Sequence, residues 1–488
     1  MIACRQHRGS EHDGSEHDRR AIRGTRRATL AGLTGLAGLG GALGTAACGP
    51  PAPATPAAPA LDPNTRAEIR LATRAGQADS PLWNDLVAHY NQLSKQVQVT
   101  NEEYPSNEFH PKIIALSAAG SAPDVAQSSD EPFFDMAHKG IWYALDDFVA
   151  RDRRAMKTED FWPGVFDFWR WDATTKVAGK GKLYGLPRAA GTELFIYNKR
   201  VFQEAGVAEP PANGNWTWGD FLERARKLVR REGDELVRAV MPLPSLRSAI
   251  PWLIGNGAPN TADVTKRVGT LNNPATIDVL RRLADYRLKE RIVPSVAETR
   301  GSTFRGNGYD LLLKGHYAMR FDIGYRSRIR EAFKSDPEVW DVALVPKGTR
   351  TTAVRGAWSP FGMSGQTKQP AAAWEFMKYA TGPEGQTKLT ELGYLYSVRK
   401  SVAEKVFVDP SSPQHEERWL EAVKFQHFEP LNEVYEKVRQ VHNYYWNQIT
   451  NEQIRRPVNE AVRLADEIVN KIYQGGDIPA DWEGLPKQ

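Results

Sequence analysis

The body of the chain alternates between two hydrophobic periods, one typical of strands and one typical of helices. Residues 69–72 and 97–99 alternate apolar and polar positions as short strands, and apolar positions at helical spacing lie between them over 82–90. A helix over 109–119 and a short strand over 124–126 continue the pattern. Such a β-α-β order predicts an α/β fold with a parallel sheet covered by helices. The spacing predicts further helices over 218–231, 274–289, 371–380 and 455–473.

The first 65 residues differ from the body. An Ala/Gly/Leu run ends at Ala47, and Arg26 and Arg27 before it resemble a twin-arginine export signal, with Thr29 where an aromatic is usual. Small residues before Cys48 resemble a lipobox, in which the thiol is lipidated and the chain is cut before it, although Thr45 stands where leucine is usual. We therefore expect an export signal over 1–47 and a lipid-anchored, Pro/Ala-rich tether over 48–65; the alternative is a buried, uncleaved helix.

Charge and cysteine content add two exclusions. The formal net charge is +5, and a surplus of three positive charges in residues 1–47 leaves a nearly neutral mature chain, which predicts no binding to nucleic acid. Of the two cysteines, Cys4 lies in the expected signal, so the mature chain has no intrachain disulfide. At 488 residues the body is long enough for roughly two or three domains.

Motifs for catalysis and metal binding are missing from the sequence. It contains no nucleophile elbow, zinc helix or phosphate loop, and its ten histidines lack ligand spacing. We expect no metal, no cofactor and no enzymatic activity. Asp146 and Asp147 leave a glycoside hydrolase as the alternative, which needs two carboxyls about 5–10 Å apart; at a helix start, such acids more often favour the helix dipole.

Several segments, in order, resemble the family 1 extracellular solute-binding proteins, the maltose-binding-protein-like group that serves ABC importers. They are residues 109–112 (FHPK), 118–125 (AAGSAPDV), 181–187 (GKLYGLP), 195–199 (FIYNK), 202–206 (FQEAG), 216–218 (WTW), 314–319 (KGHYAM), 356–358 (GAW) and 373–376 (AWEF).

The resemblance implies a type II periplasmic-binding-protein-like fold, with two α/β lobes, hinges and an interlobe ligand cleft. Lobe 1 is expected to hold 66–188 and 356–396, lobe 2 to hold 189–355, and a helical tail over 397–488 to pack mainly on lobe 2. Crossings are expected near 188–193, 350–356 and 396–399. The implied protein is an exported, lipid-anchored monomer at the outer face of the cytoplasmic membrane, in a periplasm or at the cell surface.

Its expected partners are permease subunits and a small-molecule ligand, a mono- or oligosaccharide. An anion, polyamine or peptide is the alternative ligand. Arg247, Arg326 and Arg328 lie near proposed cleft segments and leave an anionic ligand or an acidic sugar open.

Sugar binding requires flat aromatic faces and paired polar groups. By the resemblance, Trp358 lies in the loop that returns to lobe 1, Tyr325 is a stacking aromatic, and Trp252 begins the lobe-2 face of the cleft; Trp358 and Trp252 could instead be core residues. Trp83 and Tyr104 follow the first two predicted strands, and Tyr104 is expected in a loop because Pro105 follows it.

The polar candidates lie next to these aromatics or at the crossings. Asp130 and Glu131 follow the third strand, where Asp130 could instead cap a helix begun by Pro132. Arg188 and Glu193 flank the first crossing, where either could form a plain interlobe ion pair. The remaining candidates are Asp322 beside Tyr325 and Asn256 after Trp252.

Overall fold

Two sheets organise the computed structural model, which describes residues 58–76, 79–408 and 414–479. The predicted export signal, Cys48 and most of the predicted tether lie outside these residues. We call the larger sheet with the helices packed on it lobe 1, and the smaller sheet with its helices lobe 2. The exact lobe boundaries expected from the sequence stay a prediction.

The lobe 1 sheet has six strands in the order β16-β15-β3-β1-β2, with β7 paired to β15. The parallel pairing predicted for the first three strands is confirmed, because β1 pairs in parallel with both β2 and β3. β15 runs antiparallel to β3 and to β7. The strands are β1 (Ala67–Ala75), β2 (Val97–Pro105), β3 (Val125–Gln127), β7 (Gly185–Thr192), β15 (Val354–Met363) and β16 (Gln426–His427).

The lobe 2 sheet is antiparallel throughout. β8 (Leu194–Asn198) lies between β13 (Met319–Asp322) and β14 (Trp340–Ala343). β8 follows β7 after one residue, so the chain passes directly from one sheet to the other at Glu193. Three small hairpin sheets complete the strands: β4 (Arg170–Asp172) with β5 (Val177–Ala178) and β6 (Lys182–Leu183); β9 (Arg230–Glu232) with β10 (Glu235–Arg238); and β11 (Ala262–Asp263) with β12 (Val268–Gly269).

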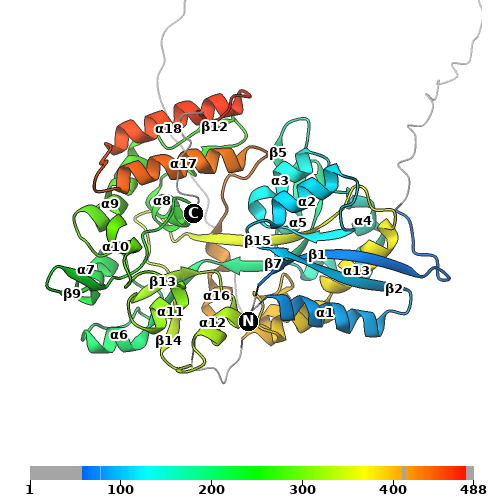
Figure 1. The fold of residues 1–488 in the computed structure, drawn as a ribbon, viewed down its shortest axis with the longest axis horizontal. Helices are drawn as coiled ribbons and strands as arrows, with labels where there is room; N and C mark the ends of the chain where they lie inside the picture. Colours follow the sequence, from blue (N-terminus) through cyan, green and yellow to red (C-terminus); the bar gives the residue numbers. More distant parts are fainter. Residues whose placement is uncertain (1–57, 77–78, 409–413, 480–488) are drawn as a thin grey trace, which may run out of the picture. The chain divides into compact units, whose positions relative to one another are not determined.

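Helices cover both sheets (Figure 1). Those of lobe 1 are α1 (Ser80–Leu93), α2 (Phe109–Ala118), α3 (Asp130–His138), α4 (Asp146–Met156), α5 (Val165–Phe168), α13 (Pro370–Ala380) and α14 (Pro383–Glu391). Those of lobe 2 include α6 (Lys199–Glu204), α7 (Trp218–Leu228), α8 (Ile250–Leu253), α9 (Pro274–Leu288), α10 (Val296–Arg300), α11 (Gly308–Leu313) and α12 (Arg326–Ala332). The tail contributes α15 (Lys400–Val402), α16 (Arg418–Glu421), α17 (Tyr435–Thr450) and α18 (Val458–Tyr473). No helix in the part of the chain that the structure describes is long and apolar enough to cross a membrane.

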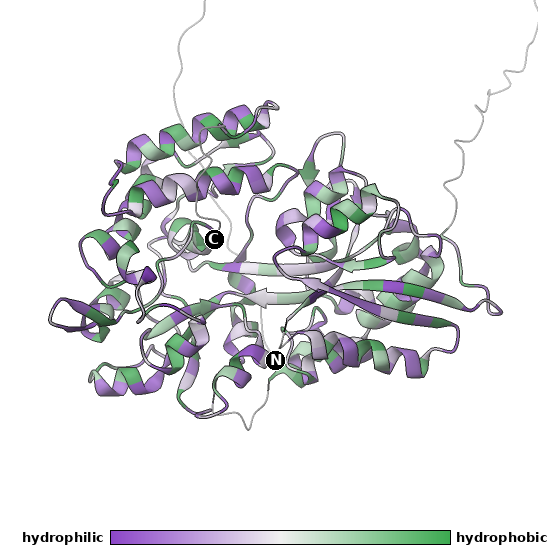
Figure 2. Cartoon of the chain, in the orientation of Figure 1, coloured by the Kyte–Doolittle hydropathy of each residue, from purple (hydrophilic) through white to green (hydrophobic). Residues whose placement is uncertain are grey.

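Local sequence signals explain where several helices begin. Thr217 and Asp220 form a reciprocal capping box that starts α7. The last helix begins at Val458, later than predicted, because Pro457 restricts the residue before it and suits a helix start. Apolar residues at three- and four-residue spacing then give α18 one buried face. Figure 2 shows hydrophobic residues in green and hydrophilic residues in purple along this helix.

The tail contacts both lobes. Arg399 donates from Nε to the Thr381 carbonyl at 2.7 Å and from Nη2 to the Met156 carbonyl at 2.6 Å, both in lobe 1. α18 lies on lobe 2, where Asp466 accepts the backbone N–H groups of Leu271 and Asn272 at 3.1 and 2.7 Å. A Cβ at Gly269 would come within 2.4 Å of Asp466, so the absence of a side chain there permits this close approach. α18 is thereby fastened to lobe 2.

His442 on α17 makes folding stability sensitive to acid. The side chain is buried, and burial lowers the pKa of its imidazole from 6.5 to about 4. Between these pH values His442 is protonated in the unfolded chain and neutral in the folded protein. The free energy of unfolding therefore falls as the pH falls through this window, by about 3 kcal/mol in total. Urea unfolding of wild type and His442→Leu at pH 7.5 and pH 4.5 measures this loss. We expect the leucine variant to lose less stability at pH 4.5; equal losses in both proteins would contradict the prediction.

Candidate ligand site between the lobes

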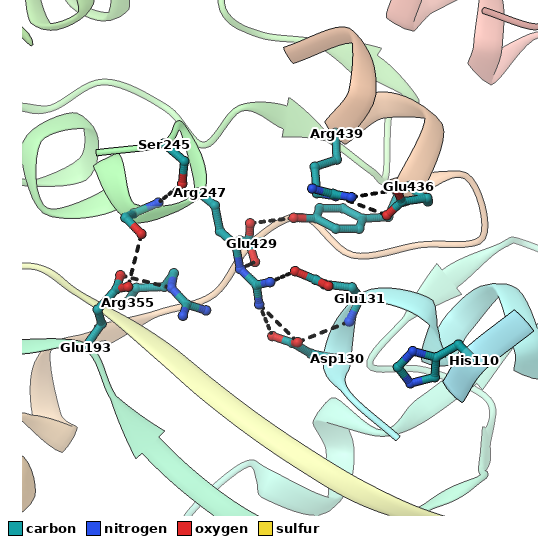
Figure 3. A network of polar contacts seen from close by, with 12 residues as sticks. His110, Asp130, Glu131, Glu193, Ser245, Arg247, Arg355, Glu429, Glu436 and Arg439 are labelled. Atoms are coloured by element: carbon teal, nitrogen blue, oxygen red, sulfur yellow. Dashed lines mark hydrogen bonds and ion pairs between the residues drawn. The ribbon is translucent and has the colours of Figure 1, made fainter. Parts of the chain in front are cut away.

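One arginine of lobe 2 binds carboxylates from other parts of the fold (Figure 3). Arg247 lies in a short 3-10 turn before α8, and its Nη2 donates to both carboxylate oxygens of Asp130 at 3.0 Å. Nη1 forms an ion pair with Glu131. Nε lies 2.8 Å from Oε2 of Glu429, outside the angle of a hydrogen bond. We call these four residues the Arg247 network; it joins lobe 2 to the start of α3 in lobe 1.

The position of Asp130 and Glu131 follows from their place at a helix start. They are the first two residues of α3, directly after the carboxyl end of β3, and negative charge is favourable in the first turn of a helix. The alternative that Asp130 caps a helix begun by Pro132 is wrong: the helix begins at Asp130 itself, with Ser129 at the N-cap position. The Asp130 carboxylate is therefore directed across to Arg247.

Glu429 and Asp130 are the two buried carboxylates of the network, with side chains 7% and 8% exposed. Burial raises the pKa of the Glu429 carboxyl, while Arg247 and Arg355 act against that rise. Tyr435 donates its hydroxyl to Oε1 of Glu429, and burial together with this carboxylate raises the pKa of the phenol well above its ordinary value. Burial of Glu429 is thus offset by one hydroxyl donor and by the nearby arginines.

Glu193 joins the same region from the crossing between β7 and β8. Its Oε2 accepts from Nε of Arg355 at 3.0 Å, and its Oε1 accepts from the hydroxyl of Ser248 at 3.0 Å. Ser248 belongs to the turn that carries Arg247. An ion pair at this crossing therefore exists between Glu193 and Arg355, whereas Arg188 forms no ion pair with a carboxylate among the described residues.

Trp358 lies in the strand β15, so its expected place in a loop is wrong. Its indole is 6% exposed and packs on Phe168 and Phe428, with ring centroids 5.2 and 4.3 Å away. A Cβ at Gly356 would come within 2.4 Å of the Phe428 ring, so the glycine lets Phe428 lie over the strand. The buried Trp358 Nε1 has no acceptor among the described residues.

Tyr325 and Asp322 lie close in sequence but have different surroundings. Tyr325 is half-buried, with the Arg328 guanidinium 4.2 Å above its ring and the Tyr394 ring 5.7 Å away. Asp322 accepts the Tyr309 hydroxyl at 2.6 Å and the Gly324 N–H at 2.8 Å. Both Asp322 oxygens are thus engaged within lobe 2.

Two aromatic candidates are buried in the protein core. Trp252 is 3% exposed and stacks on Trp218 at 4.0 Å within lobe 2. Trp83 is 1% exposed and meets the ring edges of Phe361 and Tyr394 at 5.9 and 5.3 Å.

The last two candidates make local contacts. Tyr104 lies in β2 and not in the expected loop, and its hydroxyl donates to Glu102 at 2.8 Å. Asn256 donates to the Trp252 carbonyl at 2.7 Å and accepts the Thr349 N–H at 3.1 Å.

The structure thus brings some of the predicted residues together and leaves others apart. Asp130 and Glu131 meet at Arg247, and Trp83, Arg188 and Tyr325 all contact Tyr394. Trp252, Asn256 and Asp322 make their contacts within lobe 2. Four residues that complete the region were not predicted, because the contacts of this region join segments that are far apart in the sequence: Ser248, Arg355, Glu429 and Tyr435. Across the described ranges, no group of three or more His, Cys, Asp or Glu could hold a metal ion.

Comparison with known proteins gives this arrangement its context. Residues 85–417 match the family described as bacterial extracellular solute-binding protein. The arabinooligosaccharide-binding protein of Halalkalibacterium halodurans is 26% identical over 34% of this chain and 34% of its own length. That of Bacillus subtilis is 23% identical over 65% of this chain and 72% of its own length. The chain therefore spans about a third of the first of these relatives.

Solved structures show the same fold. An ABC substrate-binding protein from Listeria monocytogenes, in complex with cycloalternan, superposes with a TM-score of 0.72 and 20% identity over 84% of this chain and 99% of that one. The GacH receptor of Streptomyces glaucescens, solved unliganded and with acarbose, superposes with a TM-score of 0.68 and 19% identity. The match covers 84% of this chain and 99% of that one. The predicted maltose-binding-protein-like fold of type II is confirmed. The matched family covers about two thirds of the sequence, and the chain belongs to the bacterial extracellular solute-binding proteins, a family of exported binding proteins.

Proposed function

We propose that this protein captures a saccharide between its two lobes and delivers it to the permease subunits of an ABC importer. The Arg247 network carries this proposal, because the Arg247 guanidinium of lobe 2 meets the carboxylates of Asp130 and Glu131 of lobe 1 at the carboxyl end of β3. Ligands of open α/β sheets bind at such strand ends. Two proteins of this fold have been solved in complex with cycloalternan and with acarbose, and two sequence relatives are named arabinooligosaccharide-binding proteins, which favours a saccharide here.

Binding would work through closure of the lobes about the segments near 188–193, 350–356 and 396–399. A ligand that contacts both lobes stabilises the closed form by the difference between its affinities for the closed and open forms. We further propose that the chain is monomeric, that Cys48 carries a lipid at the outer face of the cytoplasmic membrane, and that the bound sugar is released unchanged. ATP hydrolysis belongs to a separate subunit of the importer.

A thermal-shift screen tests the proposal. Purified protein is heated with mono- and oligosaccharides, polyamines, peptides and inorganic anions, and the mixtures are then assayed for sugar cleavage. A saccharide at a hundred times its Kd adds about 2.7 kcal/mol to the free energy of unfolding, which raises Tm by a few degrees in a protein of this size. A shift with polyamines or peptides alone would overturn the saccharide class, and cleavage of the sugar would overturn the binding role.

A further inference from the structure

Arg188 differs from the other buried arginines of the described residues. Four of them lie 3.0 to 3.8 Å from a carboxylate, in the pairs Arg326–Glu416, Arg355–Glu193, Arg399–Asp160 and Arg418–Asp341. Arg188 is 4% exposed and has no carboxylate at ion-pair distance among the residues that the structure describes. A buried cation is normally paired with an anion, because its loss of hydration is otherwise uncompensated.

The groups in direct contact with Arg188 are neutral. Its nitrogens donate to the Tyr394 hydroxyl and, at 3.4 Å each, to the carbonyls of Ser128 and Pro360. The rings of Trp83, Phe361 and Tyr394 lie 5.0 to 5.5 Å from the guanidinium carbon. These contacts orient the guanidinium and leave its charge without a counterion.

Arg74 is a second cation that has no carboxylate partner among the residues described. It lies near the carboxyl end of β1, its Nη2 contacts Nε2 of His110 at 3.0 Å, and its buried Nε has no acceptor in the described part of the chain. Burial lowers the pKa of Arg74, and the nearby Arg188 acts in the same direction. Burial also lowers the pKa of His110 to about 3, so this imidazole is neutral at pH 7 and accepts from Arg74.

Lobe 2 contributes a third cation to the same place. Arg328 lies over the Tyr325 ring and pairs with Asp79, and the Tyr325 ring meets the Tyr394 ring that contacts Arg188. Asp130, a carboxylate near Arg74, is already bound by Arg247. We call Arg74, Arg188 and Arg328 the arginine cluster; Asp79 is the one carboxylate that pairs with it among the described residues.

We propose that the captured saccharide carries an acid group, a carboxylate or a phosphate, which binds at Arg74 and Arg188. This inference rests on the proposed function and names the class of sugar. The planar guanidinium fork matches a carboxylate or phosphate. The half-buried ring of Tyr325 beside the cluster supplies apolar surface for the sugar carbons.

Paired ligands test the charge without altering the protein. Calorimetric titration compares uronate-containing disaccharides with their methyl esters, and sugar phosphates with their parent sugars. We expect one acid to bind at least about tenfold more tightly than its neutral counterpart, with an affinity that falls as salt rises. The two series distinguish carboxylate from phosphate.

The outcomes separate this inference from the proposed function. Binding of neutral sugars with no advantage for any acid would overturn the acid group and leave a saccharide receptor standing. Binding of inorganic or non-sugar anions alone would overturn the saccharide class.

Arg74→Gln provides the test from the protein side, with Arg66→Gln as its matched control. Arg66 is exposed just before β1, and its replacement removes the same charge. We expect Arg74→Gln to weaken binding of the acid at least about tenfold and to weaken binding of the neutral ester much less, while Arg66→Gln binds both as wild type does. Loss of affinity for acid and ester alike would assign Arg74 a purely structural role and overturn the inference. If Arg74→Gln fails to fold, the paired ligands on wild type still decide.

Discussion

Replacing Arg247 by methionine is expected to open the two lobes in the ligand-free protein. The substitution leaves Asp130, Glu131 and Glu429 facing one another without the guanidinium that binds all three. Removing one partner of a buried ion pair destabilises a structure by about 3–5 kcal/mol when the remaining charge stays buried and without hydration. Separation of the lobes hydrates these carboxylates and relieves that cost, so the open form gains population.

Small-angle scattering of the ligand-free protein measures this change as a larger radius of gyration for Arg247→Met. The control is Arg439→Met, because Arg439 lies beside the network but its ion pair is with Glu436, where both side chains are about a third or more exposed. Such a surface pair contributes about 0–1 kcal/mol, so Arg439→Met should scatter like wild type. If both variants keep the wild-type radius, the Arg247 network does not hold the lobes together.

Replacing Trp358 by alanine is expected to lower both stability and ligand affinity. The indole packs on Phe168 and Phe428, whose rings also contact each other, and removing it should cost about 3–5 kcal/mol of unfolding free energy. Under the proposal that Trp358 also contacts the ligand, its loss should weaken binding by about 1–4 kcal/mol. Denaturant unfolding measures the first effect, and titration with the ligand found in the screen measures the second.

The milder Trp358→Phe separates the two effects. It keeps a ring and removes Nε1, a buried donor with no acceptor in the described chain. Trp169→Phe is the matched control, because Trp169 is also buried, has the same Nε1 without an acceptor among the described residues and lies in the lobe 1 core. We expect weaker binding in Trp358→Phe alone. Wild-type affinity in a folded Trp358→Ala protein would remove Trp358 from the site.

Much of the fold could be predicted because its signals are local. The β1-α1-β2 unit was visible in apolar residues at strand and helix spacing, and β3 was placed within one residue. The antiparallel lobe 2 sheet was not predicted, since β8, β13 and β14 come from distant parts of the chain. Strand pairing across such separations leaves no local periodicity.

The candidate site was predictable only where it follows a strand. Asp130 and Glu131 could be proposed because polar residues after β3 lie at the ligand edge of a sheet. Glu429 could not, because its contact with Arg247 joins two irregular segments that are distant in sequence. Trp83 and Trp252 are core residues in the structure, and an aromatic gives the same sequence signal on either face of a helix.

The attachment of α18 to lobe 2 has a practical consequence for reporting ligand capture. With Asp466 held by two backbone N–H groups and pressed against Gly269, a fluorophore on the outer face of α18 would follow lobe 2 rigidly. A second fluorophore on α1, which packs on the lobe 1 sheet, would follow the other half. Energy transfer between the two fluorophores would convert lobe closure into an optical signal, so this fold is suitable as the scaffold of a biosensor.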